Sequence, residues 1–272
     1  MLIKLLPFQN VTAAGLATLD MRNLLGFTVN RLVLQLGGTA MTKADFTNIK
    51  IKANAKVIFD DSGSNIDARM QYRGIAANAS FLTMDFDEIK AKSIVGQQLG
   101  AIDTTAGISQ LTGEFTIAGA TAPTIEGWAQ VSAPQVQANG ASLPERGLIA
   151  KVLNFNHNFG AAGKFPLDIP YGKQGGTIVK RLHLFGATVT AVEIKKNGIT
   201  IHDSTAAVES FNQTEYGRVP QAGVYTVDFV KDGNMSNALN TANANTMEYY
   251  ATVSGAGNVQ VVAELLDPLN NN

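Results

Sequence analysis

One short strand-like segment occurs twice in this chain, once in each half. The first copy is FLTMDF at residues 81–86, and the second is YTVDF at residues 225–229. The residue numbers of the two copies differ by a constant offset of 143, and the identical positions are Thr83 and Thr226, Asp85 and Asp228, and Phe86 and Phe229. Because side chains alternate across a strand, we expect both aspartates on the outer face or at the sheet end, with Met84 and Val227 pointing inward.

The repeat continues on both sides of this segment. The same offset joins further positions, and it becomes 150 upstream and 136 downstream. It changes only between strand-like segments, which is typical of a repeated unit whose loops vary. The pattern therefore predicts two copies of one β unit. The matched positions are Ile51 and Ile194, Asn54 and Asn197, Ile58 and Ile201, Asp60 and Asp203; Arg31, Leu32 and Leu34 with Arg181, Leu182 and Leu184; and Thr116, Gly119 and Ala120 with Thr252, Gly255 and Ala256.

The junction between the two copies is rich in turn residues. The stretch SAPQVQANGASLPERG at 132–147 has two prolines, an Asn-Gly pair and few apolar residues. Such a composition is typical of a connector between folded segments. We therefore predict a first jelly roll at 1–134, a linker at 135–144 and a second jelly roll at 145–272.

Most of the remaining pattern is that of short strands closed by Gly, Asn or Asp, as in RLVLQLGG at 31–38. Each half holds about eight such segments, the number that a jelly roll needs for its two sheets. We therefore predict an all-β fold of two tandem eight-stranded jelly-roll barrels, a double jelly roll, with short helical insertions. Helices are expected at 87–99 and 234–245, and the Asn-Gly pair at 197–198 predicts a tight hairpin.

Composition excludes several classes of protein. The 272 residues include 21 Lys and Arg against 22 Asp and Glu, for a formal net charge of −1. This balance argues against direct nucleic-acid binding as the main task. The chain has no cysteine, which excludes disulfides and thiolate metal sites. No apolar run approaches the ~20 residues of a membrane-spanning helix, and the first residues are too short for a secretory signal, so we expect a soluble cytoplasmic protein.

The sequence contains the residue types of two kinds of enzyme, but not their arrangement. His202-Asp203-Ser204 resembles a catalytic triad in composition only, because neighbours on a strand face opposite ways and cannot relay a proton. A cupin-like metal enzyme needs clustered histidines, whereas His157, His183 and His202 are scattered without a shared spacing. We therefore predict no enzyme, with no catalytic residues, no cofactor-binding residues and no metal ligands.

Two loop-like segments could bind ions. DDSGSNID at 60–67 is acidic and could supply oxygen ligands to calcium, but it has no glycine at loop position six and no glutamate at position twelve of an EF-hand counted from Asp60 or Asp61. We expect a solvated turn there. YGKQGGT at 171–177 lacks the Gly-Lys-Ser/Thr order of a phosphate-binding loop, so it is also predicted to be a turn.

Two apolar features have more than one interpretation. Trp128 is the only tryptophan, and we expect it in the core or at the barrel rim; the alternative is a subunit contact, where tryptophan is enriched. The start of the chain, MLIKLLPF at 1–8, could pack on its own barrel, pack under a neighbouring subunit or touch a membrane surface. Its single lysine gives little electrostatic help at a membrane, so we favour packing on protein and do not expect the barrel cores to need it.

The order of these segments resembles the major capsid proteins of tailless icosahedral bacteriophages with an internal membrane, of the corticovirus type. The first half carries the likeness through DFTNIKIKANAKVIF at 45–59. The second half carries it more strongly, through RLHLFGATVTAVEIKKNGITIHD at 181–203, EYGR at 215–218, YTVDFVKDG at 225–233 and VQVVAEL at 259–265. The likeness is built of strands and turns and includes no catalytic signature.

The resemblance implies a coat subunit that forms homotrimers, with six barrels per capsomer, and tiles an icosahedral shell of the virion over an internal membrane. It also implies penton and membrane-associated virion proteins as partners, synthesis in the cytoplasm of a bacterial host, and leaves a structural calcium ion open. One alternative is a two-module β-sandwich that binds carbohydrate or another ligand in an aromatic-lined groove, which 7% aromatic content disfavours. The other is a bicupin-like enzyme, which the scattered histidines disfavour.

Overall fold

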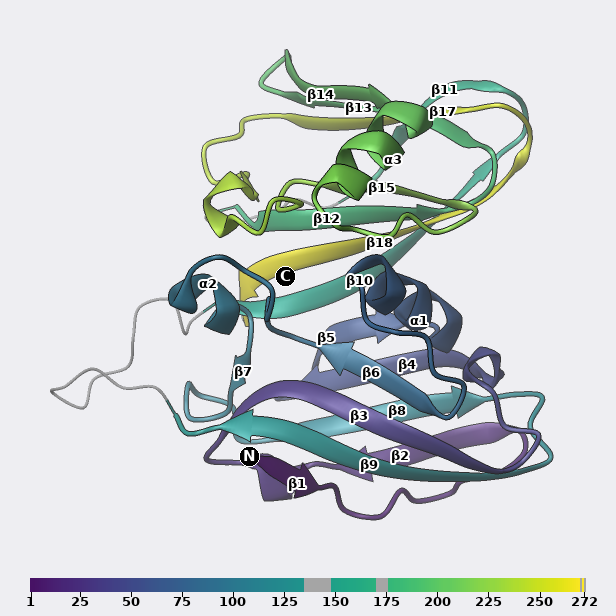
Figure 1. Ribbon diagram of the computed structural model, residues 1–272, viewed down its shortest axis with the longest axis vertical. Helices are drawn as coiled ribbons and strands as arrows, with labels where there is room; N and C mark the ends of the chain where they lie inside the picture. The colour runs from purple at the N-terminus through teal and green to yellow at the C-terminus, as the bar shows by residue number, and fades with distance from the viewer. Residues whose placement is uncertain (135–147, 170–175, 270, 272) are drawn as a thin grey trace, which may run out of the picture. The chain divides into compact units, whose positions relative to one another are not determined.

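The computed structural model describes residues 1–134, 148–169, 176–269 and 271, and strands dominate it (Figure 1). The chain divides into two compact units, and the boundary falls inside a strand. The first unit holds 1–71, 75–152 and 267–269, and the second holds 72–74, 153–266 and the C-terminal end. The predicted linker at 135–144 and most of the predicted turn at 171–177 lie outside the described residues. No helix in the described part of the chain is long and apolar enough to cross a membrane.

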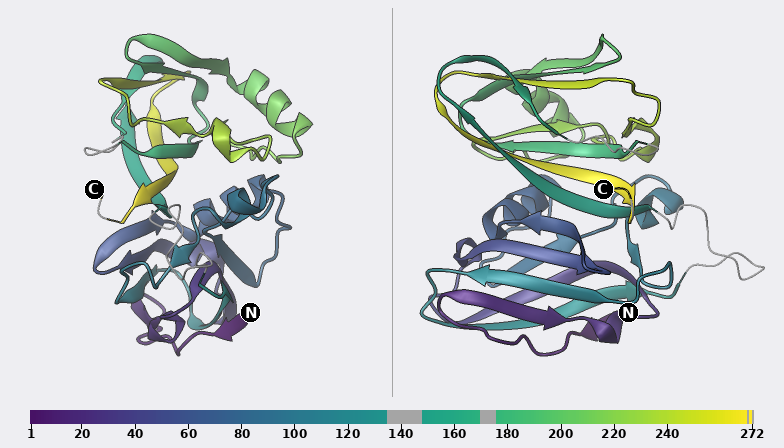
Figure 2. Two further views of the ribbon diagram at one scale, coloured as in Figure 1. Left: turned by 90° about the vertical axis from the view of Figure 1, so that its left-hand side faces the viewer. Right: turned by 180° about the vertical axis from the view of Figure 1, so that it is seen from behind.

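The second unit consists of two facing sheets (Figure 2). One sheet has the order β15-β12-β18-β10, with β16 beside β12, and the other has the order β11-β17-β13-β14. Apolar side chains such as those of Leu182, Ile194 and Val261 fill the space between them. The strands are β10 (Leu148–Phe159), β11 (Gly163–Leu167), β12 (Ile178–Phe185), β13 (Val189–Lys196), β14 (Ile199–Thr205), β15 (Val224–Asp228), β16 (Leu239–Asn240), β17 (Met247–Val253) and β18 (Gly257–Pro268).

The first unit has the same two-sheet construction. One sheet has the order β1-β9-β3-β6, with β7 beside β3, and the other has the order β2-β8-β4-β5. Phe46 and Phe115 meet in its core with ring centroids 6.0 Å apart, and Leu32 and Met84 are fully buried. The strands are β1 (Leu2–Lys4), β2 (Gly15–Asp20), β3 (Thr28–Thr39), β4 (Phe46–Ala53), β5 (Lys56–Asp61), β6 (Phe81–Asp85), β7 (Ile102–Asp103), β8 (Leu111–Ile117) and β9 (Ala122–Ser132).

Every strand of the first unit has a counterpart in the second. The sheet orders become identical when β1 to β9 are matched, in sequence, to β10 to β18. Arg31 on β3 lies opposite Asp85 on β6, and Arg181 on β12 lies opposite Asp228 on β15. The predicted equivalence of the two aspartates is therefore confirmed. Most connections in each unit cross from one sheet to the other, as in a jelly roll; the exceptions are the β4-β5 and β13-β14 hairpins and the steps from β6 to β7 and from β15 to β16. The predicted double jelly roll is therefore confirmed as well.

A shared irregularity supports the same equivalence. In the β4-β5 hairpin the pairing shifts after Ile51, and in the β13-β14 hairpin it shifts after Ile194. The residue left out of the pairing is Ile58 in the first hairpin and Ile201 in the second, so the predicted equivalence of these two residues is confirmed. Because a one-residue slip moves every later side chain to the other face, a bulge at the same position keeps both hairpins in the same register.

The helices lie mainly outside the two segments in which they were predicted. The described helices are α1 (Gly63–Tyr72), α2 (Ile94–Gln98) and α3 (Ala206–Glu215), and the short 3-10 turns are Arg22–Leu24, Lys43–Asp45 and Met235–Asn237. Only α2 falls within 87–99, and 234–245 holds a 3-10 turn and β16, so the second prediction was wrong. The longer helices, α1 and α3, instead connect the fifth and sixth strands of each unit.

The acidic segment at 60–67 is not the solvated turn that we predicted. It forms the end of β5 and the first turn of α1. Asp61 is fully buried there and accepts hydrogen bonds from the Ser62 backbone N–H and the Asn65 side chain, which stabilise the start of the helix. The polar residues of this stretch therefore form the start of a helix and its buried hydrogen bonds, not a loop.

Each unit contains the same asparagine-centred turn. Asn54 and Asn197 follow β4 and β13 with positive φ angles of 47° and 52°. The Asn197 side-chain oxygen accepts from the backbone N–H groups of Asn245 and Thr246 at 2.7 and 3.1 Å, and its amide donates to the Asn243 carbonyl at 3.2 Å. Asn54 makes the matching bonds to residues 107, 109 and 110. Each turn thus holds a loop from elsewhere in its unit: Asn54 holds the loop that leads into β8, and Asn197 holds the loop that leads into β17.

We expect substitution at Asn197 to separate the backbone effect from the side-chain effect. Asn197→Gly keeps the positive φ but loses the three bonds, at a cost of about 1–2 kcal/mol. Asn197→Ala also forces a Cβ into the left-handed region and should cost roughly 1 kcal/mol more. Urea unfolding followed by circular dichroism measures both. Equal unfolding midpoints for wild type and Asn197→Gly would show that the three hydrogen bonds contribute nothing to stability. Equal midpoints for the two variants would show that a Cβ at this positive φ costs nothing.

The N-terminal tail is part of the first barrel. Residues Leu2–Lys4 form β1, which pairs antiparallel with β9, and the backbone N–H of Leu5 donates to the Gly127 carbonyl at 2.9 Å. Leu5 is buried, and its side chain occupies the space above Gly127, where an added Cβ would come within 2.7 Å of it. The tail thus packs on its own barrel, one of the two protein surfaces that we favoured, and Leu5 belongs to the buried core, against the expectation that the core does not need the tail.

Candidate functional site

The three histidines do not form a common site in the described residues. They lie on three different strands: His157 on β10, His183 on β12 and His202 on β14. Among the described residues, no group of three or more His, Asp or Glu side chains could hold a metal ion. The Nδ1 atom of His183 lies 2.9 Å from the Thr226 hydroxyl. Burial lowers the pKa of His157 and that of His202, and in His202 it outweighs Glu209, whose carboxylate lies 3.7 Å away. Each histidine is therefore part of its own local packing.

The triad-like tripeptide is an ordinary strand. His202, Asp203 and Ser204 are consecutive residues of β14, and their burial alternates along it. Asp203 pairs across the hairpin with Glu193, and Ser204 bonds to the neighbouring Thr205 carbonyl. The expected alternation is present, and these three side chains do not form a proton relay.

The carboxylates of the acidic segment already have protein partners. Asp61 forms an ion pair with Arg69 at 2.9 Å, and both side chains are almost fully buried. Asp60 accepts from the Asn48 amide at 2.6 Å, and Asp67 forms an ion pair with Lys43. A calcium ion needs several oxygen ligands that converge on one point and are not already paired with another cation. This donor set does not fit calcium, and a structural ion elsewhere in the chain stays a prediction.

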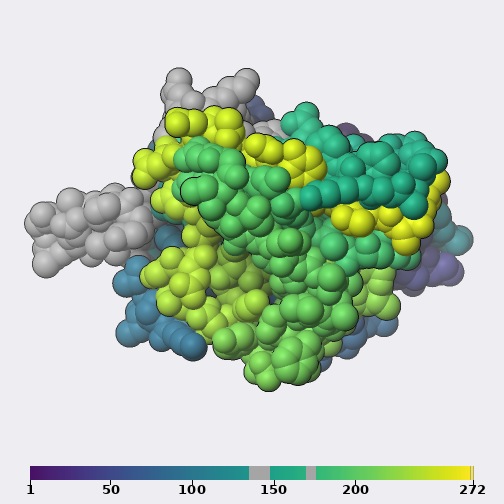
Figure 3. Space-filling model, turned by 90° about the horizontal axis from the view of Figure 1, so that it is seen from above, coloured from purple at the N-terminus to yellow at the C-terminus, as the bar shows by residue number. Residues whose placement is uncertain are grey.

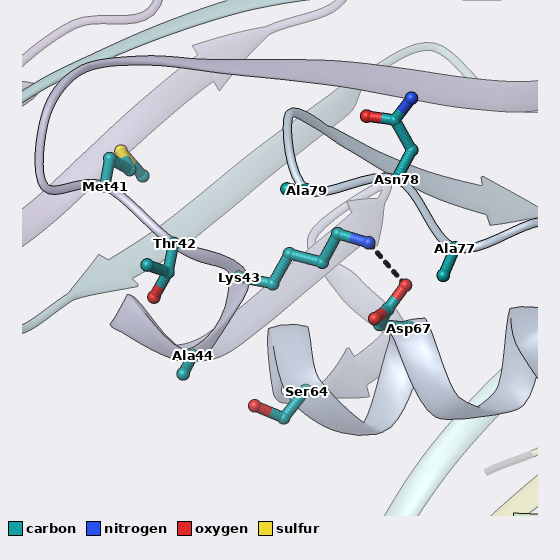
Figure 4. A pocket seen from close by; sticks show the side chains of 9 residues that line it. All are labelled: Met41, Thr42, Lys43, Ala44, Ser64, Asp67, Ala77, Asn78 and Ala79. Atoms are coloured by element: carbon teal, nitrogen blue, oxygen red, sulfur yellow. Dashed lines mark hydrogen bonds and ion pairs between the residues drawn. The ribbon is translucent and has the colours of Figure 1, made fainter.

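A shallow surface hollow lies beside this segment (Figure 4). Its volume is about 570 Å³, and Lys43 and Asp67 meet across it. Its other walls are mostly small side chains from the segment before β4, the first turn of α1 and the loop before β6: Met41, Thr42, Ala44, Ser64, Ala77, Asn78 and Ala79. Lys43 and Asp67 neutralise each other's charge, so the residues that line this hollow offer no net charge with which to orient a ligand.

An arginine–carboxylate contact occupies the same place in both units. In the first unit, Arg31 donates from Nε and Nη2 to the two oxygens of Asp85, the second at 2.9 Å, and these bonds raise the pKa of Arg31 above its ordinary value. In the second, Arg181 Nε lies 3.0 Å from Asp228, and its Nη1 donates to Glu264 at 2.9 Å. These charged side chains lie on the face of the sheet away from the core. The neighbouring Met84 and Val227 point toward the core, as predicted.

The burial of these two contacts differs. The Arg181, Asp228 and Glu264 side chains are at most 4% exposed, whereas the Arg31 side chain is 24% exposed. Glu264 has Gln130 as its counterpart, since each lies opposite the arginine of its unit. Arg181 thus has a carboxylate opposite it on β18 where Arg31 has an amide on β9, while the buried Asp87 also lies close enough to Arg31 to raise its pKa.

Large apolar side chains are exposed at several places in the described residues, among them Ile94 and Val95 on α2 and the two groups that follow. On the outer face of the β1-β9-β3-β6 sheet, Leu2 and Phe81 are exposed beside the partly exposed Trp128. Trp128 was expected in the core or at the barrel rim; it is partly exposed and not in the core, and Lys4 Nζ lies 5.6 Å from the centroid of its ring. On the second unit, β14 and α3 expose Ile199, Ile201, Val208 and Phe211.

The architecture and these surfaces together define a class. Two jelly rolls of identical strand order, joined in one chain, form the double jelly-roll fold of viral capsid proteins. The major capsid protein P2 from bacteriophage PM2 shares it at 17% sequence identity and a TM-score of 0.85, with 98% of this chain and 97% of that one covered. The major capsid protein of Sulfolobus turreted icosahedral virus is 16% identical with a TM-score of 0.72, with 98% and 96% covered. The PBCV-1 virus capsid is 12% identical with a TM-score of 0.62, with 100% and 95% covered.

Family models cover nearly the whole chain. The viral coat protein P2 N-terminal domain matches residues 2–132, and the viral coat protein P2 C-terminal domain matches residues 149–269. A comparison with curated protein sequences gives no match. The chain belongs to the viral coat protein P2 family. It is a major capsid protein, a component of the virion capsid, and not an enzyme.

Proposed function

We propose that three copies of this chain form a capsomer with six barrels, and that capsomers tile an icosahedral shell over an internal membrane. The observation that carries the proposal is the tandem of two jelly rolls with identical strand order. Three such chains give six similar units, which suit the sixfold positions of a closed lattice with few distinct contacts. The related capsid proteins support self-association of this chain.

The same proposal includes the protein's partners and its place of synthesis. Penton and membrane-associated virion proteins would complete the vertices and the contact with the membrane, and synthesis would take place in the cytoplasm of a bacterial host. A net charge of −1 gives neighbouring subunits little mutual repulsion and gives nucleic acid little attraction.

Light scattering coupled to size-exclusion chromatography tests the assembly state. We expect a stable homotrimer at micromolar concentration, because permanent interfaces bury about 2,000 Å² or more. A monomer at this concentration would contradict the proposal. Membrane association is tested separately, by flotation of purified particles before and after detergent treatment. Particles whose density does not change with detergent would carry no lipid, which would contradict the internal membrane.

A further inference from the structure

The strand β14 is an edge of its sheet. It is the last strand in the order β11-β17-β13-β14, and among the described residues it pairs only with β13. The other edge, β11, contains Pro166, which has no N–H to offer to a further strand. The segment of β14 from 199 to 203, ITIHD, has neither proline nor lysine. Natural proteins usually protect an exposed edge with such residues, because its free backbone groups can pair with another chain.

This edge also carries exposed apolar side chains. Ile199 is 69% exposed and Ile201 is 42% exposed. The helix α3 begins directly after β14 and adds Val208 and Phe211, which are 50% and 64% exposed. Figure 3 looks onto the second unit, where the green atoms of this segment lie at the surface. Exposed apolar residues on an open strand edge and on the helix that follows it are typical of an interaction site.

The helix α3 is reversed in polarity. It buries the polar side chains of Glu209 and Gln213 while it exposes Val208 and Phe211. The Gln213 amide donates to Glu209 at 3.2 Å and to the Thr226 carbonyl at 2.6 Å. A helix whose outer face stays in water has apolar residues inside and polar residues outside. The buried polar contacts therefore hold α3 in an orientation that presents its apolar side chains to a partner.

The first jelly roll contains the counterpart of this edge with a strand added to it. β5 corresponds to β14 and has the same bulge, with Ile58 in the place of Ile201. β10 runs parallel to β5 and pairs with it at Val152 and Phe59, both of which belong to the first compact unit. Ile58 is 0% exposed and Phe59 is 2% exposed. A bulged edge of this repeat therefore accepts a parallel strand, and the apolar residues of that edge are buried.

The open part of the β14 edge can be defined by residue. The Ser204 carbonyl already accepts a hydrogen bond from the Tyr225 hydroxyl at 2.8 Å, and α3 begins two residues later. Residues 199–203 therefore form the part of β14 that is open to a further strand. Within it, His202 occupies the position of Phe59, at which β5 pairs with β10. A strand added in the same register would lie opposite His202.

We propose that residues 199–203 bind an extended segment of a different polypeptide, which adds to the sheet as a parallel strand and carries aliphatic side chains at alternate positions. Main-chain hydrogen bonds supply the affinity in this mode of recognition, and alternate side chains supply the specificity. Every strand of the described residues is already paired in its own unit, so a second copy could give one up only by breaking a sheet. A second β14 would place two bulges opposite each other and bend both strands at one point, whereas β5 receives a strand of a different sequence. The inference goes beyond the proposed homotrimer, because it needs only a folded second jelly roll.

A synthetic peptide that copies residues 148–155, LIAKVLNF, is the probe, because this segment of β10 begins beside β5. We expect it to slow hydrogen exchange of the backbone amides of 199–203 in the full chain at least about tenfold, as measured by mass spectrometry. Two further peptides are N-methylated at one or the other set of alternate residues. Only one of them should bind, because a strand presents alternate N–H groups to its two sides. Protection confined to β5 or to any segment other than β14 would overturn the inference, as would equal binding of both methylated peptides.

Point variants test the site without disturbing the core. We expect Ile201→Lys to weaken binding of the peptide by at least about tenfold, because a lysine on an edge strand opposes strand addition. Phe211→Lys should also weaken it, since it removes an exposed apolar side chain from α3. Leu16→Lys is the matched control, because Leu16 is 49% exposed on β2 of the first unit. All three variants should unfold at the wild-type midpoint, and an Ile201→Lys chain that binds the peptide as tightly as wild type would contradict the site.

Assembled particles identify the natural occupant. With p-benzoylphenylalanine in place of Ile201, we expect a photocrosslink to a different polypeptide, at a segment with aliphatic residues at alternate positions. A crosslink to a second copy of this chain would overturn the inference, and so would β14 amides that exchange equally fast in particles and in the purified chain. The peptide assays use the purified chain in whatever oligomeric state it has. A monomeric wild type that binds the peptide at β14 would therefore contradict only the proposed homotrimer.

Discussion

Replacing Arg181 with methionine is expected to unfold the second jelly roll. The guanidinium lies 3.0 Å from Asp228 and 2.9 Å from Glu264, and the arginine and aspartate side chains are fully buried. Without it, two carboxylates would remain in a low-dielectric site with less compensation. Breaking a buried ion pair on one side costs about 3–5 kcal/mol, a large part of the ~5–15 kcal/mol by which a domain is stable. Soluble yield and urea unfolding followed by circular dichroism measure the loss.

Two further variants show whether the lost positive charge of Arg181 causes the expected instability. Arg31→Met is the matched control, because Arg31 holds the same place on β3 but is partly exposed and faces Gln130 where Arg181 faces Glu264. It should cost clearly less. The triple variant R181M/D228N/E264Q also removes both carboxylate charges and should regain part of the loss. An Arg181→Met protein as stable as wild type would show that the buried pairs contribute little.

Deleting residues 1–8 is expected to destabilise the first jelly roll strongly. The deletion removes β1, the buried side chain of Leu5 and the contact of Phe8 with Phe115, whose ring centroids are 5.1 Å apart. It also leaves β9 as an unpaired sheet edge, which favours aggregation. We expect little soluble protein and a lowered unfolding midpoint.

Point variants separate the strand from its side chains. Leu5→Ala should cost about 2–5 kcal/mol, as core leucines do, because Leu5 fills the space over Gly127. Leu2→Ser is the control for folding, since Leu2 is 67% exposed and should change the unfolding midpoint little. A truncated chain that unfolds at the wild-type midpoint would show that β1 is dispensable.

The strands could be predicted because their signals are local. Alternating apolar residues and Gly or Asn turns mark them in the sequence, and the repeat links Asp85 in one half with Asp228 in the other. Asn54 and Asn197 were found as matched positions, and their positive φ explains why asparagine stands at both.

The helices and the exposed surfaces could not be found in this way. α1 has a polar sequence, and its buried polar side chains bond to a carboxylate just before the helix or far along the chain: Asn65 and Arg69 to Asp61, and Tyr72 to Asp228. α3 exposes Phe211 and buries Gln213, which donates to the Thr226 carbonyl at 2.6 Å. Such helices break the usual apolar-inside pattern, so periodicity points to the wrong face or to no helix. The reversed polarity itself is the signal that sequence reasoning could have used.

The change of offset between the repeats has a practical consequence for displaying foreign peptides on a particle. The offset falls from 150 to 143 between the third and fourth strands of each unit, where the first unit has the longer loop. The second jelly roll therefore closes this corner with a shorter segment than the first, and both fold. Loop length costs little free energy compared with a broken strand. A foreign epitope grafted into the loop at 40–45 should therefore leave the subunit folded, whereas the same graft inside a bulged hairpin would lose the register.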